Sequence, residues 1–196
     1  MTRRVYSFDS PDHFVCGALG QPGQRTFYLQ AAKGDRVVSV ALEKAQVAIL
    51  AERLATLLLA LRQGGVAIGE EAPAGAPQLA EPVIEQFRVG TLTLGWDGDR
   101  ERVVIEAREL TEEDEDDDEG DEDETEEEAE AEPVLVASDL TDGPDLVRVQ
   151  LEPEAALAFA SGAVAVVQAG RPPCPNCGAP LDPIGHFCPR RNGYQN

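Results

Sequence analysis

Residues 37–62 read VVSVALEKAQVAILAERLATLLLALR, and two periodicities meet within them. Val38, Val40 and Leu42 alternate with smaller residues, which predicts a strand. Apolar residues then recur every three or four positions, on one helical face: Val47, Leu50, Leu54, Leu57, Leu58 and Leu61. This spacing predicts a helix over residues 43–62 that ends at Gly64-Gly65. A strand that runs directly into a helix therefore sets the pattern of the fold.

Three shorter segments precede this strand, at residues 5–8, 14–19 and 26–31. Asp, Gly and Pro residues separate them, and short strands with such turns between them indicate an antiparallel meander over the first 42 residues. Residues 66–82, rich in Ala, Gly and Pro, are predicted to be a linker.

The same order of segments recurs further along the chain. FVCGAL at residues 14–19 recurs as FRVGTL at residues 87–92, and TFYLQA at 26–31 recurs in pattern as RVVIEA at 102–107. The third strand, 38–42, recurs at 147–151 and again enters a helix, here with Pro153 in its first turn and Gly170 as its stop. A duplication accounts for three matches in one order, although alternation and turns also make unrelated meanders alike.

These matches predict an α+β protein of two diverged β-β-β-α repeats, each an antiparallel meander plus a helix. The first repeat covers residues 1–65, the linker 66–82 and the second repeat 83–170. Residues 171–196 form a separate C-terminal tail.

The net charge of −21 is concentrated in one segment. Residues 112–132 hold 17 acidic side chains and no basic one, which leaves 20 acidic against 16 basic residues elsewhere. This run falls between the second and third strands of the second repeat, so we expect a disordered acidic insertion over residues 111–132. The remaining chain is mildly acidic, which disfavours binding to phosphates.

No apolar run reaches the length of a bilayer span, and the first residues lack the apolar stretch of a secretory signal. We therefore expect a cytoplasmic protein with no membrane partner. Reduced cysteines in that compartment favour metal ligation over disulfides.

The tail carries the clearest chemical motif, Cys174-x2-Cys177-x8-His186-x-Cys188. Three thiolates and an imidazole complete a tetrahedral Zn²⁺ set, and a saturated set of this kind is structural. A regular second knuckle would have a cysteine at position 191, where this chain has Arg191. Two alternatives thus stay open: a site with three protein ligands, or three reduced cysteines in an apolar turn.

Other motifs do not amount to a site. Pro173-Cys174-x-x-Cys177 matches half of the nucleobase deaminase signature, but His-x-Glu is absent, because Phe14 and Val15 follow His13. His13 and Cys16 face opposite ways on a strand, so we interpret them as a surface histidine and a small buried cysteine. The aspartates that begin at Asp114 resemble an EF-hand start with a misplaced glycine. No catalytic or cofactor-binding residue is predicted.

Residues 14–27, 38–44 and 170–194 resemble the uncharacterised bacterial family called domain of unknown function 3090, sometimes labelled a repeat protein. The resemblance covers nearly the whole chain except the acidic insertion and the linker, and the C-terminal motif is its specific part. Cys16 lies where the family does not require a cysteine. The resemblance supports the fold and implies no established activity or substrate.

Three functions compete. The first is a non-enzymatic interaction protein whose zinc tail and acidic loop contact other proteins. The second is a single-stranded nucleic-acid-binding protein of the whirly-like pseudo-dimer type. Strand meanders that are followed by a helix and duplicated are similar to such binders, and zinc ribbons often accompany nucleic acids. The third is an enzyme with an open three-ligand zinc.

Overall fold

The computed structural model describes residues 3–21, 23–69, 78–111, 142–169, 174, 176–177, 188 and 190. These residues form a mixed α+β structure of seven strands and two helices. In chain order they are β1 (Val5–Asp9), β2 (His13–Leu19), β3 (Thr26–Lys33), β4 (Arg36–Leu42), α1 (Lys44–Gln63), β5 (Glu85–Asp97), β6 (Arg102–Glu109), β7 (Leu146–Leu151) and α3 (Pro153–Gln168).

The seven strands form one sheet in the order β1-β7-β6-β5-β4-β3-β2. The hairpins β2–β3, β3–β4, β5–β6 and β6–β7 are antiparallel, as expected. The expected meander over the first 42 residues is wrong for β1, which pairs in parallel with β7, with Val5 opposite Leu146. A second parallel pair, β4 with β5, joins the two groups of hairpins. The alternation of a strand indicates which of its residues share a face, but not which strand lies beside it.

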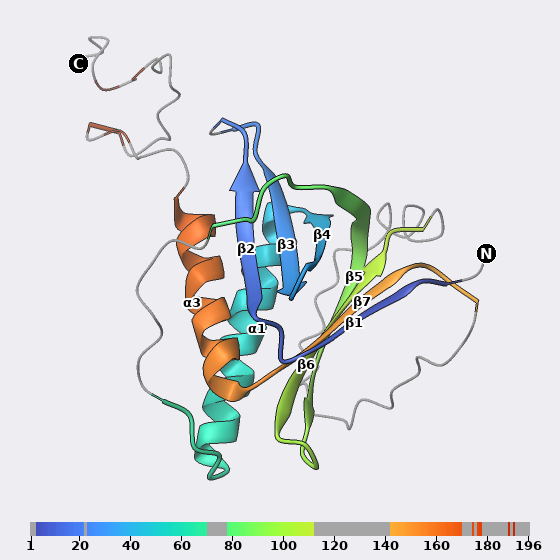
Figure 1. The fold of residues 1–196 in the computed structure, drawn as a ribbon. Helices are drawn as coiled ribbons and strands as arrows, with labels where there is room; N and C mark the ends of the chain where they lie inside the picture. Colours follow the sequence, from blue (N-terminus) through green and yellow to red (C-terminus); the bar gives the residue numbers. More distant parts are fainter. Residues whose placement is uncertain are drawn as a thin grey trace.

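Strands β1 and β2 are at opposite ends of the sheet order, yet residues 10–12 alone connect them. The sheet must therefore curl. Figure 1 shows β5, β6, β7 and β1 crossing β2, β3 and β4 at an angle. The β3–β4 turn contacts β1 where the two groups meet: Lys33 Nζ donates to the Asp9 carbonyl, and the Arg36 guanidinium lies 4.8 Å from the centre of the Phe8 ring.

Helices α1 and α3 lie side by side, and α3 packs against β2 (Figure 1). The Phe14 and Phe159 rings stack with centroids 4.5 Å apart, which joins β2 to α3. At the start of α1, the Gln46 side chain accepts from the Glu43 backbone N–H and donates to the carbonyls of Val89 and Gly90 on β5. The Gln46 side chain therefore caps the start of α1 and also bonds α1 to β5.

The core beneath the helices draws on every strand and both helices. Its fully buried members include Leu54 of α1, Val40 of β4, Ile105 of β6 and Val149 of β7. All four are apolar residues of the strands or of the helical stripe that the sequence predicts. Burial of their apolar surface stabilises the packing of the helices on the sheet.

The opposite face of β2 and β3 is crossed by residues 78–84, the segment that leads into β5. Gln30 is fully buried on this face, and its side-chain amide bonds both ends of Ala80: Nε2 donates to the carbonyl at 3.1 Å, and Oε1 accepts from the N–H at 2.7 Å. Leu79 lies so close to Gly17 that a Cβ there would be 2.5 Å from its Cγ. The Gly of FVCGAL is thus needed for this close approach.

The ladder registers test the three sequence matches separately. Ala31 lies opposite Val38, and Ala107 lies opposite Val147, so the matches of the second and third strands are consistent with each other. The match of the first strands is displaced, because Leu19 lies opposite Thr26 whereas Asp97, not Leu92, lies opposite Arg102. The residue opposite Arg102 thus lies five positions after Leu92, the residue that the sequence match places there, and β5 is longer than β2, with 13 residues against 7.

Within the described part of the chain, neither helix combines the length and the apolar character that crossing a bilayer requires.

Candidate metal centre

Three cysteines converge near the C-terminus. The Sγ atoms of Cys174, Cys177 and Cys188 lie within 4.8 Å of one another, and those of Cys174 and Cys188 are 3.9 Å apart. Four ligands at the ordinary Zn–S distance place neighbouring sulfurs about 3.8 Å apart in a tetrahedron. A disulfide requires about 2.05 Å. The three cysteines form no disulfide, and their sulfur atoms have the spacing of metal ligands.

The surroundings of Cys174 favour its thiolate. Cys174 and Cys188 are buried, and Cys177 is half-buried. Hydrogen bonds from the backbone N–H groups of Asn176 and Cys177 lower the pKa of Cys174. This is the knuckle geometry expected of Cys-x-x-Cys, in which backbone donors reach a sulfur. Because the thiolate is the form that binds metals, the site is electrostatically prepared for a cation.

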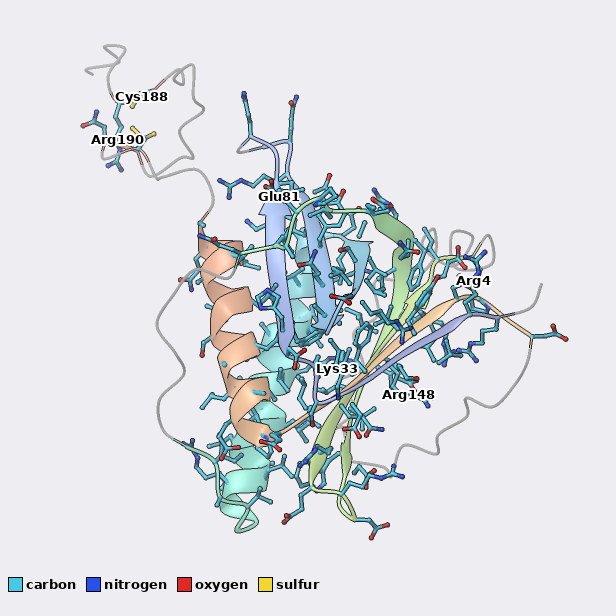
Figure 2. The ribbon with its side chains drawn as sticks, viewed as in Figure 1. Arg4, Lys33, Glu81, Arg148, Cys188 and Arg190 are labelled. Carbon is cyan, nitrogen blue, oxygen red and sulfur yellow. The ribbon has the colours of Figure 1, made fainter. Side chains whose placement is uncertain are left out.

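One further contact joins the two segments that carry the cysteines. Arg190 Nη1 donates to the Asn176 carbonyl at 3.0 Å. Figure 2 shows Arg190 next to Cys188 and the clustered sulfur atoms, beyond the C-terminal end of α3. The knuckle and the segment around Cys188 are thus connected by a hydrogen bond as well as by the thiols.

Comparison with known proteins supports one family. The family model described as a protein of unknown function (DUF3090) matches residues 6–188. The chain belongs to this family. The matched region extends from β1 to Cys188, so it includes both helices and all three clustered cysteines. No curated protein and no solved structure matches significantly.

The DUF3090 structure brings together three of the four predicted metal ligands. The fourth, His186, lies outside the described residues, as does the EF-hand-like run at Asp114. Cys16 is not part of the cluster. It is 1% exposed in β2, and burial raises its pKa to about 12, so the interpretation of a small buried cysteine is confirmed.

Two contacts were not predicted from the sequence. His13 is not simply a surface residue: it is half-buried, and its Nε2 lies 3.0 Å from the Gln78 carbonyl. The contact of Arg190 with Asn176 has no signal in the motif beyond a basic residue two positions after Cys188. Both contacts depend on backbone carbonyls, which a sequence pattern does not position.

Proposed function

We propose that the DUF3090 protein binds one structural Zn²⁺ through Cys174, Cys177, His186 and Cys188. The observation that carries the proposal is the convergence of three sulfurs within 4.8 Å. Soft thiolates select Zn²⁺ or other thiophilic ions over Mg²⁺ or Ca²⁺. His186 comes two residues before Cys188 and is the imidazole that can complete the set.

A complete Cys3His set leaves no position for a substrate, so we propose a non-enzymatic role. The tail from residue 171 holds few large apolar side chains and so has little core of its own. Metal binding would supply the folding free energy that burial does not. The centre would thus give this end of the chain a fixed shape for contact with a partner.

We further propose that the body consists of two diverged repeats. The consistent registers of the second and third strands support this, and so does a pair of polar contacts. Gln30 and Ser39 face each other on β3 and β4 and are bonded at 3.0 Å. Glu106 and Arg148 face each other at the corresponding positions of β6 and β7 and are bonded at 2.6 Å. Both pairs lie on the face opposite the helices.

A protein partner suits the charges of this chain better than a nucleic acid does. Apart from the acidic insertion, the chain has more acidic than basic residues. Several arginines of the sheet are already paired: Arg4 with Asp145, Arg88 with Glu43, Arg102 with Glu152 and Arg148 with Glu106. Phosphate binding requires a net positive surface, which such pairing reduces. A reducing compartment such as the cytoplasm would keep the ligand thiols available.

The metal content of untagged protein, purified without chelator, tests the zinc proposal. We expect one zinc per chain by elemental analysis. Cys174→Ser and His186→Ala should lower the zinc retained after dialysis, whereas Cys16→Ser should retain it and serves as the matched control. Zinc-free wild-type protein would refute the proposal. Equal retention by His186→Ala would leave a three-cysteine site with an open position.

The interaction role has its own test. Cross-linking of tagged full-length protein in cells, with and without residues 171–196, should yield partners that depend on the tail. Retention of labelled single-stranded DNA or RNA at low salt, lost at higher salt, would instead favour the nucleic-acid alternative.

A further inference from the structure

The hydrogen bonds around Asn176 and Cys177 converge on one peptide group. The Asn176 carbonyl accepts from Arg190, and the N–H of the same peptide, which belongs to Cys177, donates to the sulfur of Cys174. In a trans peptide the carbonyl and the N–H lie in one plane and point in opposite directions. Arg190 and the Cys174 sulfur therefore lie at opposite edges of this peptide group, each hydrogen-bonded to it.

We propose that Arg190 is a positioning residue of the metal centre, which holds the peptide between Asn176 and Cys177 so that its N–H stays directed at the Cys174 sulfur. This inference rests on the proposed zinc site. It goes beyond that site by assigning a role to a side chain that is not a ligand.

The geometry gives Arg190 two effects. Rotation of the 176–177 peptide would break the Cys177 N–H bond to sulfur, and a guanidinium on the carbonyl resists that rotation with a charge-assisted hydrogen bond. A cation at the carbonyl also polarises the peptide and strengthens its N–H as a donor. Both effects act on Cys174 through the backbone, without any contact between the guanidinium and the metal.

Arg190 also connects the two halves of the centre. It follows Cys188 by two residues, whereas its hydrogen-bond acceptor lies between Cys174 and Cys177. This hydrogen bond therefore adds to the connection that a metal held by Cys174, Cys177 and Cys188 would make between these segments. Because the guanidinium is exposed, its removal should not disturb a core. Removal of a residue that orients a metal ligand through hydrogen bonds typically lowers the metal affinity by about 10–100-fold.

The test is zinc release from the zinc-loaded full chain to a chromogenic chelator. We expect Arg190→Ala to release zinc roughly 10–100 times faster than wild type. Arg190→Lys, which keeps the charge and one donor, should restore most of the difference. Arg191→Ala removes the same charge from the neighbouring position and should release zinc at the wild-type rate. The cobalt-loaded proteins add a spectroscopic readout: the sulfur-to-cobalt charge-transfer band should shift in Arg190→Ala and not in Arg191→Ala.

Two results would overturn the inference: release from Arg190→Ala at the wild-type rate with an unchanged cobalt spectrum, or equal acceleration by Arg191→Ala, which would show a general effect of charge. If Arg190→Ala loads no zinc, Arg190→Lys takes its place in the test. Zinc loading and a cobalt spectrum close to wild type in Arg190→Lys would support the inference, and a lysine variant that also loads no metal would oppose it. Zinc-free wild-type protein, measured first, would refute the metal site itself and is thereby distinguished from failure of the role of Arg190.

Discussion

The buried ion pair between Glu106 and Arg148 offers a quantitative test of the fold. Arg148 Nε lies 2.6 Å from Glu106 Oε1, and the two side chains are 14% and 9% exposed, respectively. Glu106→Gln removes the negative charge and leaves a guanidinium in a poorly hydrated position. Loss of one partner of a buried pair costs about 3–5 kcal/mol, and the partial exposure of Arg148 favours the lower end. At this chain length, about 3 kcal/mol corresponds to a Tm lower by roughly 6–12 °C.

The assay is urea unfolding followed by far-ultraviolet circular dichroism, with thermal melts alongside. Replacement of both partners by apolar residues, Glu106→Leu with Arg148→Met, should recover stability to within about 1 kcal/mol of wild type, because no buried charge is left unpaired. Arg88→Met is the matched control at the exposed pair with Glu43, where we expect a loss of less than about 1 kcal/mol. The reasoning fails if Glu106→Gln costs no more than Arg88→Met, or if the double variant is as unstable as Glu106→Gln.

Three further predictions concern the strand face under residues 78–84 and the buried thiol. Gly17→Ala should lower the free energy of unfolding by about 1–3 kcal/mol, because the new Cβ meets Leu79. Leu79→Ala in the same chain should restore part of this loss, and strictly additive effects of the two substitutions in urea unfolding would argue against the contact. Gln30→Ala should speed hydrogen exchange at the Ala80 N–H, measured by mass spectrometry, and an unchanged rate would contradict the anchor. Burial raises the pKa of Cys16 to about 12, so above roughly pH 9 the unfolded chain loses a proton that the native state keeps. Stability should then fall with rising pH, by up to about 1.4 kcal/mol per unit, more steeply in wild type than in Cys16→Ala; parallel profiles in pH-dependent urea unfolding would refute this.

Local features of the fold could be predicted from the sequence because they arise from neighbouring residues. The predicted helix over residues 43–62 corresponds to α1 at Lys44–Gln63, and the strand that precedes it ends at Leu42 as expected. The apolar stripe of α1 is buried because its spacing places Leu50, Leu54 and Leu58 on one side. Antiparallel hairpins also followed from short turns between alternating segments.

The parallel contacts could not be predicted in this way. Pairing of β1 with β7 brings together residues about 140 positions apart, and no turn chemistry specifies it. The same holds for the close approach of Leu79 to Gly17, where the sequence shows a glycine but not the side chain that requires it. The sequence match of residues 14–19 with 87–92 likewise could not show that β5 is 13 residues long where β2 has 7, and that Asp97 rather than Leu92 lies opposite Arg102.

The candidate site was more accessible to prediction than the sheet. Ligand spacing is a local property, so Cys174, Cys177 and Cys188 could be selected from the motif, and they lie together as expected. Cys16 could be set aside because it and His13 point to opposite faces of a strand, and Cys16 is buried in β2. The contact of Arg190 with a backbone carbonyl depends on how the two segments face each other, which spacing alone does not fix.

X-ray absorption at the zinc edge of chelator-free, full-length protein tests the central claim most directly. We predict a shell of three sulfur atoms at about 2.3 Å and one nitrogen atom at about 2.0–2.1 Å, with no exchangeable oxygen ligand. Protein without zinc, or a bound zinc surrounded by fewer than three sulfurs, would contradict the claim that these cysteines close around a metal ion.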